Sequence, residues 1–341
     1  MQEDQIAADP DYDSAYDFSL EEPSTSSLQS SLLEFQEENG RTYHRMSEGK
    51  REYIYPNDDR ESDRLDLQDS LYVITLDGER WVSPGAATAK QVLDMGTGTG
   101  LWAMEFADAN PQAEVIGVDL SPIQPSFVPP NCKFEIDDLE KEWTWKVPFD
   151  YVFSRMMTGS FASPKAMAER VFENLAPGGW YEIQDIQLPV LCDDGTLDPE
   201  TSSLVKWQKG LIEGSKAVGR PLGVTDENKG LLEQAGFINV HETVYRWPTN
   251  SWPKDRKLKE LGRWNLANFD AGLEGVSLAL FTRVLSWSKE EVLALCSEVR
   301  KELRNPKVHG YWKIYIVYGQ KPEAPKRDEE AEVQEEPATT T

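Results

Sequence analysis

The sequence predicts an α/β protein with a doubly wound, mostly parallel sheet and helical insertions that form a lid. Two observations support this fold class. Short apolar segments alternate along the chain with amphipathic segments of helical spacing, as in βαβ units. In addition, Val92–Asp119 (VLDMGTGTGLWAMEFADANPQAEVIGVD) has the pattern strand, glycine-rich turn, helix, strand.

This stretch places two acids on one edge of the predicted sheet. The first strand ends at Asp94, and the second, Ala113–Val118, is followed by Asp119. Three alternating glycines between them cost about 1 kcal/mol each in a helix interior. They suit a turn whose backbone approaches a ligand closely; these glycines are Gly96, Gly98 and Gly100. Open parallel sheets bind ligands at this carboxyl edge.

The rest of the chain supplies further elements by the same periodicity. Strands are predicted at Cys132–Ile136, Phe149–Phe153, Trp180–Ile186, Ile238–Trp247 and Tyr311–Tyr318. Helices are predicted at Asp58–Leu76, Pro164–Leu175, Pro199–Val218 and Thr225–Ala235. Two helical insertions, at about 187–224 and 248–305, follow the fifth and sixth strands, and Ser288–Glu291 opens the last helix as a capping box.

The glycine turn indicates the kind of ligand. A dinucleotide fingerprint requires Gly or Ala where this chain has Leu101. Asp94 would also repel a pyrophosphate, but it suits a ligand with a cationic amino-acid part. Asp119, nineteen residues after Gly100, can accept both hydroxyls of a ribose. S-adenosylmethionine fits this combination, and a dinucleotide oxidoreductase is disfavoured.

VLDMGTGTG followed by VIGVD resembles motif I and the next acidic position of class I S-adenosylmethionine-dependent methyltransferases. RTYHRMSEGKREYIYPNDDRESDRLD, VDLSPIQP, CDDGTL, LLEQAGF and HGYWKIYIVYGQKP extend the resemblance to the fungal LaeA-type methyltransferases, a group tied to secondary metabolism. The resemblance implies a Rossmann-like sheet of seven strands, the last antiparallel. It implies cofactor contacts from Asp94, Gly96, Thr97, Gly98, Gly100, Asp119 and Leu120, with Asp137 or Asp138 on the adenine.

Charge is concentrated at the two ends of the chain. The formal net charge is −25 over 341 residues, and residues 1–40 hold eleven acids without Lys or Arg. We expect acidic tails at 1–38 and 323–341 around a methyltransferase domain at 39–322, because such segments bury too little apolar surface to fold. A chain this acidic is not expected to bind nucleic acid directly. The N-terminal tail could instead dock a protein partner.

The sequence gives little support for a metal site or a membrane-spanning segment. The three cysteines and three histidines lack metal-ligand spacing, and no apolar run approaches a membrane span. We therefore predict no metal and no membrane segment, and a cytoplasmic location. The catalytic residues remain open, and the candidates are His44 and Arg155. Tyr43, His44, Tyr53, Tyr55 and Pro56 are expected to form a cover over the cofactor, with packing at the sheet edge as the alternative.

The acceptor is the least determined part of the prediction. We favour a small natural product held under the helical lid, with Trp264 and Phe269 contributing to its selection. A LaeA-type regulator that acts through nuclear protein partners is the alternative, and it would place the protein in the nucleus.

Overall fold

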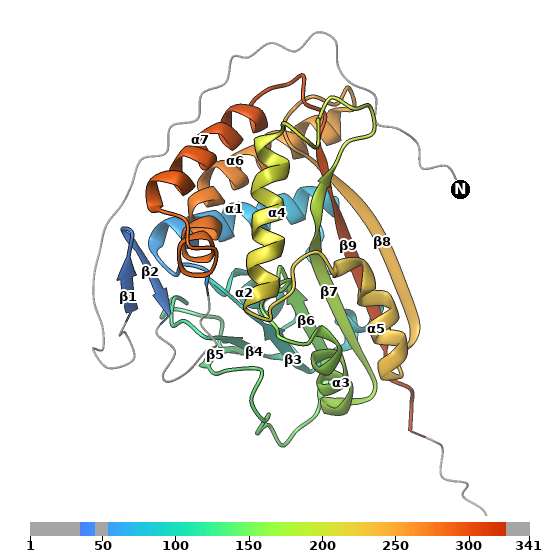
Figure 1. Ribbon diagram of the computed structural model, residues 1–341. Helices are drawn as coiled ribbons and strands as arrows, with labels where there is room; N and C mark the ends of the chain where they lie inside the picture. The colour runs from blue at the N-terminus through green and yellow to red at the C-terminus, as the bar shows by residue number, and fades with distance from the viewer. Residues whose placement is uncertain (1–34, 45–53, 325–341) are drawn as a thin grey trace, which may run out of the picture.

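The computed structural model describes residues 35–44 and 54–324, and its centre is a seven-stranded sheet (Figure 1). The strand order is β5-β4-β3-β6-β7-β9-β8, in which β3 to β7 run parallel and β9 is antiparallel to both neighbours. The strands are β3 (Gln91–Met95), β4 (Glu114–Asp119), β5 (Cys132–Ile136), β6 (Phe149–Arg155), β7 (Leu175–Leu191), β8 (Ile238–Pro248) and β9 (Tyr311–Gln320). The predicted fold class is confirmed.

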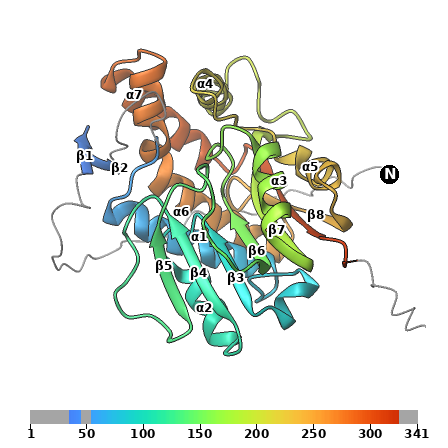
Figure 2. The same ribbon diagram turned by 90° about the horizontal axis from the view of Figure 1, so that it is seen from below.

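Helices cover both faces of this sheet (Figure 2). One layer contains η1 (Pro84–Thr88) and α2 (Leu101–Ala109), and the other contains α3 (Pro164–Asn174), η2 (Thr225–Glu227) and α5 (Asn228–Ala235). Val92 packs in the core with α2, whereas its neighbour Leu93 packs in the core with α3. This alternation follows from the two-residue period of a strand whose faces are both buried.

A third core lies beyond the carboxyl ends of the parallel strands. It is built from α1 (Asp59–Thr75), α4 (Ser203–Ala217), α6 (Arg256–Ala279), the π-helical turn η3 (Leu280–Val284) and α7 (Lys289–Leu303). Figure 1 shows these helices grouped at one end of the molecule, beside the long strands β7, β8 and β9. The capping box at Ser288 and Glu291 opens α7 as predicted.

β7 is much longer than its sequence pattern indicated. Its pairing with β6 ends at Gln184, but β9 continues alongside it as far as Leu191. The predicted strand end at Ile186 was therefore wrong, because the antiparallel partner keeps pairing after the parallel one has ended. The part of β7 beyond Gln184 thus connects the sheet to the lid helices.

The N-terminal boundary also differs from the predicted one. Phe35–Glu38 forms strand β1, which pairs with β2 (Arg41–His44) in a separate hairpin. The predicted tail at 1–38 therefore overlaps this hairpin, and the remainder of it, like residues 325–341, lies outside the described residues. No helix within the described ranges has the length and apolarity needed to cross a membrane.

Candidate functional site

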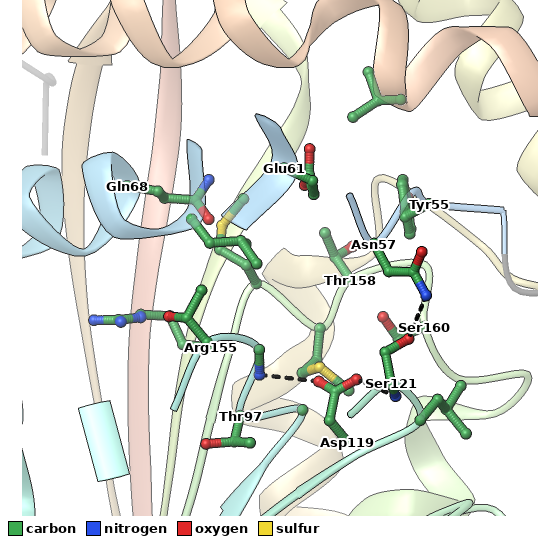
Figure 3. Close-up of a pocket in the computed structure, with 18 of the residues that line it drawn as sticks. Tyr55, Asn57, Glu61, Gln68, Thr97, Asp119, Ser121, Arg155, Thr158 and Ser160 are labelled. Carbon is green, nitrogen blue, oxygen red and sulfur yellow. Dashed lines mark hydrogen bonds between the residues drawn. The ribbon is translucent and has the colours of Figure 1, made fainter. Parts of the chain in front are cut away.

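A pocket lies at the carboxyl ends of β3, β4 and β6, between the sheet and helix α1 (Figure 3). Its cofactor half is lined by the glycine turn and by the acids predicted from the sequence. These residues are Asp94, Gly96, Thr97, Gly98, Thr99, Leu101, Asp119, Leu120, Asp137 and Asp138. The sheet therefore brings together groups that are more than forty residues apart, as expected for strands that end at one edge.

The glycine turn has a backbone that other residues would strain. Gly96 and Gly98 both have left-handed backbone angles, with φ of 68° and 57°. A Cβ on Gly96 would overlap the thioether of Met157, and one on Gly98 would lie 3.2 Å from Leu65 of α1. Glycine at these two positions thus lets Met157 and Leu65 of α1 pack closely against the turn.

Gly100 differs from the other two glycines. It is the N-terminal cap of α2, with φ of 82°, and a Cβ there would overlap the ring of Phe134. It is not among the described residues that line the pocket. In this structure Gly100 shapes the start of α2, and its direct contact with a cofactor, expected from the resemblance, stays a prediction.

Asp94 is a buried acid at the end of β3, only 3% exposed. Its Oδ2 accepts a hydrogen bond of 2.6 Å from the Thr97 hydroxyl. Burial raises the pKa of Asp94 to about 7, although Thr97 and the positive charge of Arg155 act in the opposite direction. A cationic ligand group beside this carboxyl would favour its ionised form.

Asp119 is held by the turn that it faces. Its Oδ2 accepts from the Gly98 N–H at 2.9 Å and its Oδ1 from the Ser121 N–H at 3.0 Å. Each carboxylate oxygen has a second lone pair, so both remain able to accept a ribose hydroxyl. Burial raises the pKa of Asp119, and the backbone N–H groups oppose that shift.

The segment before β3 contributes residues that the sequence analysis missed. Asn57 lies in the pocket lining, and its Nδ2 donates to the Ser121 hydroxyl at 3.1 Å, beside Asp119. The family resemblance could have indicated Asn57, because YPNDD belongs to one of the stretches that support it. No periodicity argument distinguishes Asn57 from the polar residues around it.

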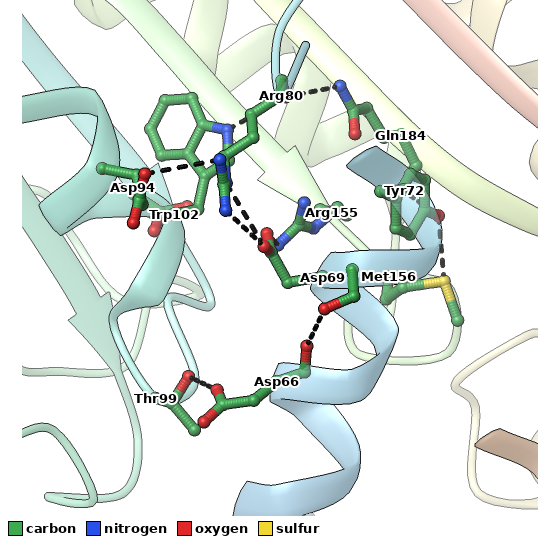
Figure 4. Close-up of polar contacts among 12 residues, drawn as sticks. Asp66, Asp69, Tyr72, Arg80, Asp94, Thr99, Trp102, Arg155, Met156 and Gln184 are labelled. Carbon is green, nitrogen blue, oxygen red and sulfur yellow. Dashed lines mark hydrogen bonds and ion pairs between the residues drawn. The ribbon is translucent and has the colours of Figure 1, made fainter. Parts of the chain in front are cut away.

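Helix α1 is fastened over the cofactor half by polar contacts (Figure 4). The Thr99 hydroxyl donates to Asp66 at 2.7 Å, which joins the glycine turn to the helix. Asp69, 2% exposed, accepts from Arg155 at 2.7 Å and from Arg80 at 3.2 Å. Arg155 therefore pairs with an acid of α1 from the end of β6, and its candidacy as a catalytic residue stays a prediction.

Beyond the cofactor half the pocket becomes mainly apolar. This half is lined by residues of β7, of the lid and of the segment after β6, namely Phe161, Ile186, Leu188, Trp207, Leu211, Leu222, Phe269 and Val276. One polar group of the roof is Arg64, which donates to Glu61 at 2.7 Å and to Asn268 of α6 at 2.8 Å. The pocket is thus continuous from the glycine turn to the lid.

The predicted cover is only partly in the pocket. Tyr55 and Pro56 line it, and burial raises the pKa of Tyr55 to about 12, so its phenol stays protonated at neutral pH. Tyr43 instead packs in the lid core beneath Arg283. The backbone of His44 pairs in β2, while its side chain and Tyr53 lie outside the described residues.

Phe269 and Trp264, which were both expected to help select the acceptor, lie in different surroundings on α6. Phe269 lines the pocket, whereas Trp264 is 37% exposed on the outer side of α6 and is absent from the described lining. The proposed role of Trp264 in acceptor selection was therefore wrong, because helical spacing did not show which face of α6 turns inward.

In the described part of the chain no group of three His, Cys, Asp or Glu side chains could hold a metal ion.

The parallel sheet, the glycine turn and the acids at the ends of β3 and β4 define an S-adenosylmethionine-dependent methyltransferase. A family model described as a methyltransferase domain matches residues 74–242. The methyltransferase pytC of Aspergillus terreus is 38% identical over 300 residues, covering 88% of this chain and 92% of that protein. The secondary metabolism regulator of Cochliobolus heterostrophus is 37% identical, with 84% and 94% covered.

The protein-methionine methyltransferase laeA of Emericella nidulans is 34% identical over 306 residues, which cover 88% of this chain and 81% of that protein. The chain belongs to the LaeA-type family of fungal methyltransferases, and its methyl donor is S-adenosylmethionine. The family and cofactor predictions are confirmed. The contacts of individual residues with the donor stay predictions based on the geometry above.

Proposed function

We propose that this methyltransferase transfers the methyl group to a bulky, mostly apolar small molecule of fungal secondary metabolism. The observation that best supports the proposal is the continuity of the pocket. The pocket that contains Asp94 and Asp119 extends between α4 and α6, where its lining is mainly apolar. Enclosed apolar pockets with a few polar groups are typical of small-molecule sites.

Methyl transfer from S-adenosylmethionine requires the protein mainly to align the donor and the acceptor. S-adenosylmethionine supplies the electrophilic methyl group when it is bound. The residues of the chain would hold donor and acceptor in line and exclude water from the reacting atoms. Glu61, Arg64 and Asn268 form a polar group in the roof that can orient an acceptor hydroxyl or carbonyl. The pocket lining includes no histidine among the described residues.

The relatives support two roles for such an enzyme. One is named a methyltransferase and another a regulator of secondary metabolism. We favour the biosynthetic role, with a cytoplasmic location, because the acceptor half is lined mainly by apolar side chains of β7, α4 and α6, which suit an apolar small molecule. The regulatory role remains the second candidate, with a nuclear location and the acidic N-terminal arm as its docking segment.

Deleting the gene and profiling both metabolites and transcripts distinguishes these roles. A biosynthetic enzyme leaves one pathway stalled at a precursor that lacks one methyl group, while the transcripts of that pathway persist. Loss of transcripts across several unrelated pathways would reject the biosynthetic proposal in favour of the regulator.

A further inference from the structure

Gln68 is a buried amide that faces the pocket without a protein partner. It lies on α1, is 5% exposed and lines the pocket. Figure 3 shows its carboxamide projecting from the helix into this space. No hydrogen bond joins its amide to another described residue, and the amide atoms are not among the described polar atoms that are both sealed from solvent and unpartnered. An amide that opens onto a pocket and has no protein partner is free to bind a ligand group there.

The neighbours of Gln68 place it at one particular end of the cofactor half. One turn earlier on α1, Leu65 lies against Gly98, and the next residue, Asp69, pairs with Arg155. Arg155 is close enough to Asp94 to lower the pKa of that carboxyl. Figure 3 shows Gln68 and Arg155 on one side of the pocket, with Asp119, Asn57 and Ser121 on the other.

A donor whose ribose is held by Asp119 therefore points its amino-acid end toward Asp94 and Gln68. That end has an ammonium and a carboxylate. Asp94 suits the ammonium, but Asp94 and Asp69 together would repel the carboxylate unless a donor compensates. Arg155 is a poor candidate, because its Nη2 binds Asp69 and its unpartnered Nη1 is sealed from solvent.

We infer that the Gln68 side-chain amide donates a hydrogen bond to the carboxylate of S-adenosylmethionine. A neutral donor suits this position, since a second free cation beside Asp94 would compete with the ligand ammonium. The inference concerns the methyl donor and goes beyond the proposed acceptor, so its failure would leave that proposal intact.

Calorimetry with two ligands and the full chain tests the assignment. One ligand is S-adenosylmethionine, and the other is its decarboxylated form, which keeps the adenosine, sulfonium and amine. Gln68→Leu should weaken binding of S-adenosylmethionine by about tenfold, as for a lost hydrogen bond to a charged group. Binding of the decarboxylated form should stay unchanged. Gln68→Glu should weaken the former further and leave the latter equal or tighter, because the new charge repels only a carboxylate.

The same substitutions at Gln234, exposed on α5, serve as controls and should change neither affinity. Melting temperatures without ligand report whether each variant is folded. Equal weakening of both ligands by Gln68→Leu would show a purely structural role and overturn the inference. Unchanged binding of both ligands would overturn it as well, and would leave Gln68 free to face the acceptor.

Discussion

At the scale of single residues, the site combines two buried acids with different tasks. Burial raises the pKa of both carboxyl groups, to about 7 for Asp94, whereas in Asp119 two backbone N–H groups oppose the shift by binding the carboxylate. This difference suits a ligand with a cation at one end and hydroxyl groups nearer the other. Both acids were predicted from their position at strand ends.

Asp119→Ala should weaken binding of S-adenosylhomocysteine. The two ribose hydroxyls would lose a charged acceptor, which costs about 1.5–3 kcal/mol for a hydrogen bond of this kind. Titration calorimetry measures the change, with Asp63→Ala on the exposed side of α1 as a control. Equal affinity in variant and parent would reject the ribose assignment.

Cofactor binding should also depend on pH through Asp94. The bound ammonium requires the charged carboxyl, whose pKa is raised to about 7 without ligand. Below that pH a proton must be released on binding, so the affinity should fall by up to about tenfold per pH unit and level off above it. In Asp94→Asn the affinity should be lower and this dependence absent. A slope that persists in the variant would assign the titration to another group.

At the scale of elements, α1 and α6 together form the roof of the pocket. Arg64 of α1 donates to Asn268 of α6, and a Cβ on Gly272 would overlap the Arg64 side chain. This close approach brings Phe269 into the pocket lining and turns Trp264 outward. The two aromatic residues, five positions apart, therefore differ in their expected effect.

Phe269→Ala should reduce acceptor turnover while the affinity for S-adenosylhomocysteine changes little. Trp264→Ala is the matched control and should leave both unchanged, because the indole lies on the outer side of α6. Methyl-transfer rates and calorimetry on both variants provide the comparison. Parallel loss of turnover and cofactor affinity in Phe269→Ala would show that the residue serves only the packing of the lid, where it also stacks on Trp312.

The elements also show what the sequence could predict and why the rest was out of reach. The strand ends and the glycine turn follow from local rules, so Asp94, Gly96, Gly98 and Asp119 were found. Asn57 and Gln68 were not found, since their roles arise only when α1 lies across the sheet edge. Likewise, the full length of β7 depends on β9, which is more than 110 residues later in the sequence.

At the scale of the whole molecule, the methyltransferase body begins at the β1–β2 hairpin. Glu38 of β1 accepts from Arg283 of η3 at 2.7 Å, which links the hairpin to the lid. Removing residues 1–34 and 325–341 should leave the melting temperature and cofactor affinity nearly unchanged, because their acidic sequences have little apolar surface to bury.

Extending the N-terminal deletion to residue 38 should lower the melting temperature, since it removes β1 and the Glu38–Arg283 pair. Differential scanning calorimetry of both truncations tests this boundary. A drop of many degrees in the shorter deletion would show that the acidic arm packs on the body.

The central claim is that one continuous pocket joins the methyl donor to a small-molecule acceptor. The most direct test incubates the purified full chain with S-adenosylmethionine carrying a labelled methyl group and an extract of the deletion strain. The label is then followed into the small-molecule and protein fractions, with Asp119→Ala, whose affinity for the donor should be lower, as the control at low donor concentration. We predict label in one organic-soluble compound and none in protein. Label confined to protein, whether to a partner or to the enzyme itself, would contradict the account.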